Sequence, residues 1–210
     1  MSAPANSLTS WTEEPRRSGF SWFVVNLGRI AVQLWIALLS QFIGVLGALS
    51  TPGMKPAGWL QARALRAMGV KCPSNQVWVG PQVHFDFPRN LELGRRVTIG
   101  AQSRITARSR VVIGDDFLGA PGLMLNTGTH DIATLVPQSA AVVIGPGVWC
   151  GARVTIGAGV TVGEHAVLGT GSVVLRDIPA RHLAYGVPCR PQRPLPATPA
   201  EQRWSNFRNA

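Results

Sequence analysis

Residues 142–177 read VVIGPG VWCGAR VTIGAG VTVGEH AVLGTG SVVLRD, six hexapeptides in one unbroken register. The third position is apolar in all six, and the fourth is glycine in the first five. An α-helical stripe would recur every 3.6 residues, and glycine at this density would weaken a long strand. We therefore predict a triangular solenoid, in which each hexapeptide forms one short side and each glycine lets the chain turn the corner.

The same frame extends upstream and predicts which side chains fill the prism. The inward positions of the six hexapeptides are Ile144, Cys150, Ile156, Val162, Leu168 and Val174, with Val148, Val154, Val160, Ala166 and Ser172 as a second inward set. The corresponding upstream positions are Val79, Phe85, Leu93, Ile99, Ile105, Ile113, Gly119 and Leu125. Residues that recur once per side stack from coil to coil, so these should form one continuous core.

Three interruptions of the frame fall on one edge of the predicted prism. Two-residue insertions follow Phe85 and Ile105, and a long insertion follows Leu125. With three sides to a coil, all of them lie at the same corner. Insertions confined to one edge of a repeat protein usually mark its working face. The long insertion opens with NTGTHD at residues 126–131 and therefore places His130 on that edge.

Length and composition indicate one domain with an appendage. The chain has 210 residues, of which 46% are hydrophobic and 14% charged, so it can bury a core. Its formal charge of +10 favours an anionic partner, such as a membrane surface, a phosphorylated cofactor or a nucleic acid. The arginines are scattered rather than gathered on one helix or aromatic stripe, which argues against nucleic acid.

The three cysteines, Cys72, Cys150 and Cys189, are odd in number and lack CxxC spacing. Neither a disulfide framework nor a zinc knuckle is expected, and reduced thiols in a cytoplasmic protein are predicted. Cys150 takes an inward position, so it should be a core residue rather than a nucleophile.

Residues 30–49 form an uncharged stretch of twenty residues, long enough to span a bilayer as a helix. A cleaved signal peptide is disfavoured because the stretch ends about fifty residues into the chain. A true span is weakened by Gln33, Gln41, Gly44 and Gly47, and by basic residues on both sides. We favour a helix, or a helical hairpin, that lies against a membrane or a partner chain.

Four segments follow from these patterns. Residues 1–20 predict a mobile leader, and residues 21–71 predict an apolar and amphipathic helical segment that could associate with a membrane. Within the latter, the first helix should be broken by Pro52, Gly53 and Pro56. A second, short helix is expected at residues 59–68, which either caps the sheet domain or touches the membrane. The β-helix domain is expected at residues 72–193 and a tail at residues 194–210.

The hexapeptides, the TGTHD loop, the GVWCGA that follows it and the closing RDIP and AYGVPCR resemble the left-handed β-helix hexapeptide acetyltransferases. The resemblance covers residues 77–193. The chain is similar to the galactoside, maltose and nodulation O-acetyltransferases and to those of colanic acid biosynthesis. It implies a left-handed parallel β-helix, a homotrimer with active sites between neighbouring prisms, acetyl-CoA as the donor and a sugar hydroxyl as the acceptor.

Acetyl transfer to a hydroxyl needs a base, because a sugar hydroxyl is too weakly acidic to attack a thioester unaided at pH 7. His130 is the candidate, since a neutral imidazole can accept that proton and pass it to the leaving thiolate. Asp131 is expected to cap the loop rather than to orient the imidazole. The other histidines, His84, His165 and His182, are expected to be structural or solvated. They lack the close spacing of the zinc histidines in γ-class carbonic anhydrases, so no metal is expected.

The resemblance also implies a coenzyme A site, and arginines suit the phosphates of that cofactor. The residues it carries over are Ala152 and Thr170 as main-chain contacts along the pantetheine arm, Leu175 and Arg176 as the next contacts, and Arg190 and Arg193 as phosphate or adenine contacts. Trp149 either walls the thioester pocket or packs the base of the loop.

The acceptor side departs from the family pattern. Galactoside acetyltransferases hold their sugar with an Asn and an Asp on the coils before the catalytic histidine, whereas residues 100–110 (GAQSRITARSR) contain three arginines and no carboxylate. Arg104, Arg108 and Arg110 therefore suggest an anionic acceptor, such as a uronic-acid or phosphate-bearing glycan. The candidate acceptor-binding residues are Asn126, Arg108 and Trp149.

The leading hypothesis is an acetyl-CoA-dependent O-acetyltransferase that acts on a cell-surface polysaccharide or its lipid-linked precursor at the cytoplasmic face of the membrane. Two alternatives remain: acetylation of a small molecule such as an antibiotic, a free sugar or serine, and a non-catalytic β-helix scaffold. Replacement of His130 separates the catalytic hypotheses from the scaffold, because only a catalyst would lose turnover.

Overall fold

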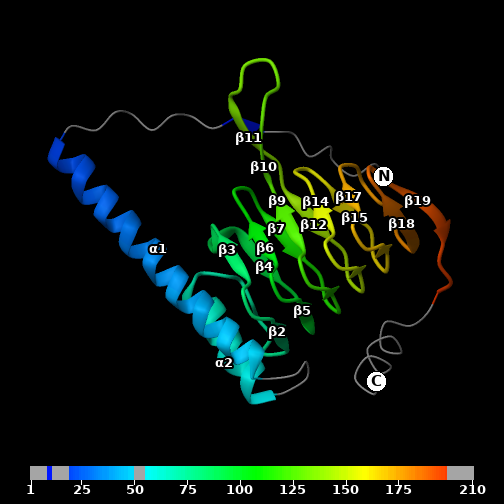
Figure 1. Cartoon of the computed structure of the whole chain (residues 1–210), viewed down its shortest axis with the longest axis horizontal. Coiled ribbons are helices and arrows are strands. Elements are labelled where there is room, and N and C mark those ends of the chain that lie inside the picture. The colour runs from blue at the N-terminus through cyan, green and yellow to red at the C-terminus, as the bar shows by residue number, and fades with distance from the viewer. Residues whose placement is uncertain (1–8, 11–18, 50–54, 198–210) are drawn as a thin grey trace.

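A computed structural model describes residues 9–10, 19–49 and 55–197 as a parallel β-helix with two helices at one end (Figure 1). Sheet 1 contains β2 (Val77–Val79), β5 (Val97–Ile99), β8 (Leu118–Gly119), β13 (Trp149–Cys150), β16 (Val167–Leu168), β18 (His182–Gly186) and the antiparallel β19 (Cys189–Pro194). Sheet 2 contains β3 (His84–Asp86), β6 (Arg104–Thr106), β9 (Met124–Asn126), β14 (Thr155–Ile156) and β17 (Val173–Val174). Sheet 3 contains β4 (Leu91–Leu93), β7 (Val111–Ile113), β12 (Val142–Ile144) and β15 (Thr161–Val162). The chain visits the three sheets in turn through about five coils, so the predicted fold is confirmed.

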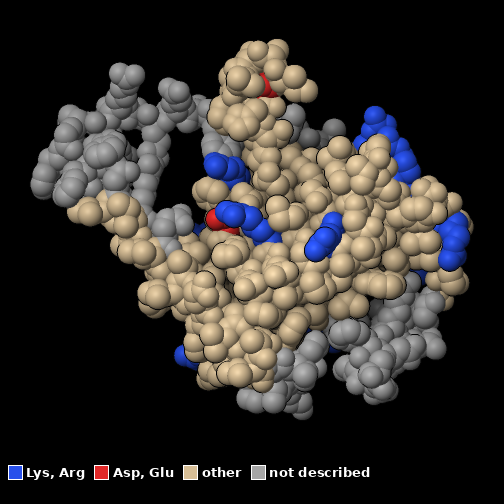
Figure 2. All heavy atoms as spheres, viewed as in Figure 1, with Lys and Arg blue, Asp and Glu red and all other residues tan. Residues whose placement is uncertain are grey.

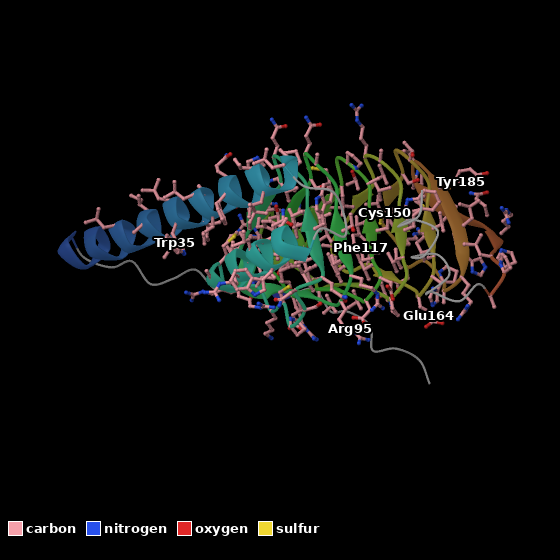
Figure 3. The ribbon with its side chains drawn as sticks, turned by 90° about the horizontal axis from the view of Figure 1, so that it is seen from below. Trp35, Arg95, Phe117, Cys150, Glu164 and Tyr185 are labelled. Carbon is pink, nitrogen blue, oxygen red and sulfur yellow. The ribbon has the colours of Figure 1, made fainter. Side chains whose placement is uncertain are left out.

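The predicted interior is also confirmed. Every side chain assigned to the inward positions is buried, from Val79 to Val174. Strands of successive coils pair in parallel register, so each inward residue stacks on its equivalent in the next coil. Figure 3 shows Phe117 and Cys150 among the coils, and Arg95 and Glu164 at the outer edge.

The hexapeptide glycines are required by close packing between coils, and the expectation that they turn the corners is wrong. A Cβ added to Gly151 would lie 2.7 Å from the backbone nitrogen of Thr170 in the next coil. The left-handed turn lies at the sixth position of each hexapeptide, two residues after the fourth-position glycine. Positive φ angles recur there, at Gly147, Arg153, Gly159, His165 and Gly171. A residue with a Cβ adopts that conformation at a cost of roughly 1–2 kcal/mol, so glycine is favoured there but is not required.

The insertions share one corner, as predicted. This loop corner lies between sheets 2 and 3 and contains the short 3-10 helix η1 (Pro88–Asn90) in the first coil. In the third coil the long insertion forms a hairpin of β10 (Gly128–His130) and β11 (Pro137–Ser139), which projects from the prism (Figure 1). The short strand β1 (Thr9–Ser10) pairs with the other edge of β11.

Helices α1 (Gly19–Ala48) and α2 (Lys55–Ala67) lie at the N-terminal end of the prism. The second helix begins four residues before its predicted start, because Pro56 occupies its first turn, where proline is tolerated, rather than breaking it. The other two predicted breakers, Pro52 and Gly53, lie outside the described residues, as do residues 1–8 and 11–18 of the predicted leader and residues 198–210 of the tail.

Helix α2 caps the first coil, which confirms one of its two expected roles. Ala62 and Leu65 are fully buried against the prism, whereas Arg63 and Arg66 are exposed. The end of α1 docks beside it, and Gly47 approaches the carbonyl oxygen of Val79 so closely that no Cβ would fit. The earlier part of α1 extends away from the coils (Figure 1).

Gln61 on α2 forms hydrogen bonds to both α1 and β2, the first strand of the prism. Its Nε2 donates to the carbonyl oxygens of Ile43 (3.1 Å) and Val79 (2.8 Å), and its Oε1 accepts from the backbone nitrogen of Val79 (3.1 Å). The side chain is completely buried, so these groups have no access to water once it is removed.

We expect Gln61→Ala to lower the free energy of unfolding by about 2–4 kcal/mol, because it leaves buried backbone groups of α1 and β2 without partners. Urea denaturation followed by circular dichroism measures the loss. The matched control is Gln76→Ala, since Gln76 is exposed and its removal should change stability by less than about 0.5 kcal/mol. Equal stabilities for the two variants would contradict this role of Gln61.

Within the described residues, one stretch, Ile30–Ala48, is long and apolar enough to cross a membrane by length and composition alone. Its mean hydropathy is 1.9 and 24% of it is buried against the rest of the chain. The exposed large apolar side chains of α1 are Leu27, Ile30, Val32, Leu34, Trp35, Leu38, Phe42, Val45 and Leu49, the last just beyond its end. Residues 30–48 contain no charged side chain, and the described part of α1 that faces the viewer in Figure 2 is tan.

Candidate active site

His130 ends β10 and is exposed, on the hairpin of β10 and β11 that projects from the loop corner in Figure 1. Its backbone pairs with Pro137 across the hairpin, so the ladder fixes its position. An imidazole presented in this way can contact a ligand bound outside the prism, as a general base must.

Asp131 caps the loop beyond His130, as predicted. Its Oδ1 accepts hydrogen bonds from the backbone nitrogens of Thr134 (2.8 Å) and Ala133 (3.1 Å) and from the Thr134 hydroxyl (2.8 Å). These bonds, led by the one from the Thr134 backbone, hold the pKa of the Asp131 carboxyl below its ordinary value. Its carboxylate is therefore used to shape the turn.

A polar row runs along sheet 2 towards the hairpin. Asp86, Thr106 and Asn126 occupy equivalent positions in three successive coils. The Thr106 hydroxyl donates to Asp86 Oδ2 (3.1 Å), and Asn126 Oδ1 accepts from the backbone nitrogen of Gly128, where β10 begins. Sequence reasoning proposed Asn126 but missed Asp86 and Thr106, whose shared spacing of twenty residues was the available signal.

Two of the three arginines that suggested an anionic acceptor form ion pairs. Arg104 Nη2 lies 2.8 Å from Asp86 Oδ2, and Arg110 Nη2 lies 2.9 Å from Glu92 Oε2. Arg110 and then Lys71 lower the pKa of the Glu92 carboxyl to about 2, so this carboxylate is ionised at neutral pH. Carboxylates of the preceding coil thus pair with Arg104 and Arg110, two of the arginines that the sequence suggested would bind an anionic acceptor.

Arg108 lies beside the hairpin. Its guanidinium stacks over the ring of Phe87, 4.9 Å from the centroid, and its Cδ lies 2.9 Å from the position of a Cβ added to Gly128. The structure therefore places this candidate acceptor residue against the base of β10.

Two of the candidate coenzyme residues meet at the corner between sheets 1 and 2. Ala152 follows β13 and Thr170 follows β16, and the backbone nitrogen of Gly171 donates to the carbonyl oxygen of Ala152 (2.8 Å). Arg190 and Arg193 lie exposed on β19 at the C-terminal end of sheet 1. Ala152 and Thr170 therefore lie along one corner of the prism, and Arg190 and Arg193 lie at its C-terminal end.

Leu175 and Arg176 lie on the loop corner, on the same edge as His130. They follow β17, and Leu175 packs over Gly157 of the preceding coil, with Cδ2 3.1 Å from an added Cβ. Both side chains are exposed. The candidate coenzyme contacts are therefore divided between two corners of a single chain.

Trp149 is half-exposed on the outer face of sheet 1, where it pairs with Leu118 and Val167. This face is opposite the loop corner of the triangular prism, so the proposal that Trp149 packs the base of its own loop is wrong. The structure does not bring Trp149 and His130 together within one chain.

The remaining candidates lie apart from the hairpin. Cys72, Cys150 and Cys189 are buried free thiols, and desolvation raises the pKa of each. His165 occupies a left-handed corner, and His182 Nδ1 lies 2.8 Å from the carbonyl oxygen of Ala180. Across the described part of the chain, no three His, Cys, Asp or Glu side chains gather as metal ligands would.

The described residues form a hexapeptide β-helix that carries a histidine on the hairpin of one corner. The family of bacterial transferase hexapeptide repeats (six repeats) matches residues 141–176. The chain is 37% identical over 118 residues to galactoside O-acetyltransferase of Escherichia coli K12, a match covering 54% of this chain and 58% of that enzyme. It is 30% identical over 153 residues to a Saccharomyces cerevisiae protein assigned to the acetyltransferases, covering 70% of this chain and 76% of that protein.

A solved structure of galactoside acetyltransferase in complex with coenzyme A superimposes with a TM-score of 0.61 at 29% identity. The superposition covers 79% of this chain and 82% of the other. This chain therefore belongs to the hexapeptide-repeat acetyltransferase family.

Proposed function

We propose that this protein transfers the acetyl group of acetyl-CoA to a hydroxyl of a saccharide, with His130 as the general base. The observation that carries the proposal is the position of His130 on the hairpin that projects from the insertion corner of a hexapeptide β-helix. The coenzyme A complex of galactoside acetyltransferase supports the choice of donor.

The reaction requires one proton to move twice. His130 accepts the proton of the acceptor hydroxyl as the oxygen attacks the thioester carbonyl and the new C–O bond forms. The C–S bond then breaks, and the imidazolium returns the proton to the leaving sulfur, which yields an acetyl ester and free coenzyme A. No covalent acyl-enzyme is needed, in keeping with the burial of all three thiols.

The proposal includes a homotrimer, because one chain does not assemble the site. His130, Leu175 and Arg176 lie on the loop corner, whereas Ala152 and Thr170 lie at another corner. A neighbouring prism that presents its corner between sheets 1 and 2 to this loop corner would bring both sets around one acetyl-CoA.

Arg190→Ala should raise the KM for acetyl-CoA about tenfold with a smaller effect on kcat, because a charge-assisted contact to phosphate contributes to binding away from the reacting atoms. Steady-state measurement of coenzyme A release tests this. The control is Arg63→Ala, since Arg63 stacks over Trp59 on α2, far from β19. A KM that is the same for Arg190→Ala and Arg63→Ala would remove Arg190 from the cofactor site.

The acceptor class is tested with a panel of neutral and anionic glycosides, with acetylation detected by mass spectrometry. The ion pairs of Arg104 and Arg110 favour neutral hydroxyl-bearing acceptors over the anionic ones that the sequence suggested. Acetylation confined to uronic-acid or phosphate-bearing glycosides would overturn this preference.

We also propose that the protein works at the cytoplasmic face of a membrane, with α1 lying in the interface rather than crossing it. Its exposed apolar face suits the boundary of a bilayer, while Gly47 and Ile43 are held against the first coil. The formal charge of +10 adds attraction to anionic lipids. Synthesis of a cell-surface polysaccharide would place the acceptor at the same surface.

A further inference from the structure

A cavity of about 140 Å³ lies between α1 and sheet 2, beside the first two coils and before the coil that bears the His130 hairpin. Its walls are Ile36, Ala37, Ser40 and Gln41 from the helix and His84, Phe85, Asp86 and Arg104 from the first two coils. It has room for about five water molecules at roughly 30 Å³ each, enough for part of one sugar ring but not for a whole coenzyme.

The polar wall of this cavity suits uncharged hydroxyl groups. Asp86 and Arg104 form an ion pair, with Arg104 Nε and Nη2 donating to Asp86 Oδ2 at 3.0 and 2.8 Å. A carboxylate paired with a guanidinium offers strong acceptors and donors side by side without a net charge. Ser40 and Gln41 add a hydroxyl and an amide on the opposite wall. These are the groups that recognise a polyol.

The cavity is continuous with the proposed catalytic edge. Asp86 belongs both to its wall and to the polar row that continues through Thr106 to Asn126. Adjacent coils are about 4.8 Å apart, so this row spans about 10 Å from the cavity to the coil that bears the hairpin. A saccharide that starts in the cavity can therefore extend towards His130.

The surface around the helical wall is apolar. Leu34, Trp35, Leu38 and Phe42 are between 45% and 67% exposed and alternate along α1 with the residues that line the cavity. A ligand with its polar end among Ser40, Asp86 and Arg104 would thus meet apolar side chains wherever it continues along the helix.

We propose that this cavity binds the uncharged sugar head of an amphiphilic acceptor, a lipid-linked saccharide, whose hydrocarbon chain lies along the exposed apolar face of α1. The inference rests on the proposed acetyltransferase function, since the bound sugar is the substrate of that reaction. It assigns to α1 a second task besides membrane contact, which is to select acceptors that carry a lipid.

Photolabelling of the full-length protein tests the site without turnover. The probe is octyl β-glucoside with a diazirine in its alkyl chain, used below its micelle concentration. We expect labelling within residues 34–42, competition by unlabelled octyl β-glucoside, and equal labelling of His130→Ala, which binds but does not react. Failure of the acetyltransferase proposal would then be seen in the activity of the unmodified protein and not in the labelling.

Two variants decide the outcome. Ala37→Trp fills the cavity and should reduce labelling about tenfold or more by excluding the sugar. Asp86→Asn keeps the shape of the cavity but removes the charged acceptor, and it should reduce labelling about tenfold, the effect of one hydrogen bond to a charged group. The matched control is Ala31→Trp, which adds the same ring to an exposed position of α1 away from the cavity. A diazirine-bearing octanol, which lacks the sugar, should label all the variants equally.

Labelling by the glucoside probe that is unaffected by Ala37→Trp and Asp86→Asn would overturn the proposal, because the helix would then bind only the alkyl chain. Absence of labelling in residues 34–42, as expected if a second copy of the chain covers this face, would also overturn it.

Discussion

His130→Ala should lower kcat for acetyl transfer by about 10²- to 10⁴-fold, the contribution of a well-placed general base. The KM for acetyl-CoA should change little, because the imidazole acts on the acceptor hydroxyl and not on the nucleotide. The assay is coenzyme A release in the presence of an acceptor that the wild type acetylates.

The matched control for this prediction is His182→Ala. His182 lies on β18, at the C-terminal end of sheet 1, and its ring contacts the carbonyl oxygen of Ala180 rather than the hairpin. This variant should retain wild-type kcat. Undiminished turnover in His130→Ala would exclude His130 as the base and would favour a water-mediated route.

Charge on the outer face of α1 should release the protein from membranes. Leu34 and Leu38 are 60% and 67% exposed, and burial of each in the lipid interface stabilises binding by about 1.5–3 kcal/mol. The double variant Leu34→Glu/Leu38→Glu should therefore lower partitioning into vesicles of anionic phospholipid by about 100-fold or more. Vesicle co-sedimentation measures the difference.

The control for charge alone is Gln76→Glu/Gln102→Glu. Both glutamines are exposed on the prism, so this variant changes the net charge by the same amount without touching α1. It should bind vesicles nearly as well as the wild type. Wild-type protein that remains in the supernatant, or equal binding by both double variants, would contradict membrane association through α1.

The sequence predicted the prism because its repeat is a local property of the chain. A side of six residues places the same position inward each time, so Ile144, Ile156 and Leu168 could be assigned to the core without any knowledge of their neighbours. The corner that carries the hairpin followed from counting residues between inward positions, and this placed His130 on the outer edge. The loop cap by Asp131 was predictable for the same reason, since its partners lie two and three residues away.

Only the tertiary structure decided which side chains of neighbouring coils form ion pairs. Arg104 and Asp86, like Arg110 and Glu92, are separated by eighteen residues and pair because successive coils stack. Two of the three arginines in residues 100–110 are paired with carboxylates of the coil before them, and this changed the expected acceptor.

The helical cap and the division of the site also depended on packing. The burial of Gln61 between α1, α2 and β2 has no signature in a helical pattern, because its partners are backbone atoms brought together by the fold. In the same way, nothing in the order of residues shows that Trp149 faces away from His130, which lies only nineteen residues before it in the chain. Thus the periodic sequence determined the coil, its core and the edge that carries the insertions. Contacts between coils and helices, which depend on their positions in space, determined the ion pairs, the cavity beside α1 and the separation of the candidate site residues between two corners.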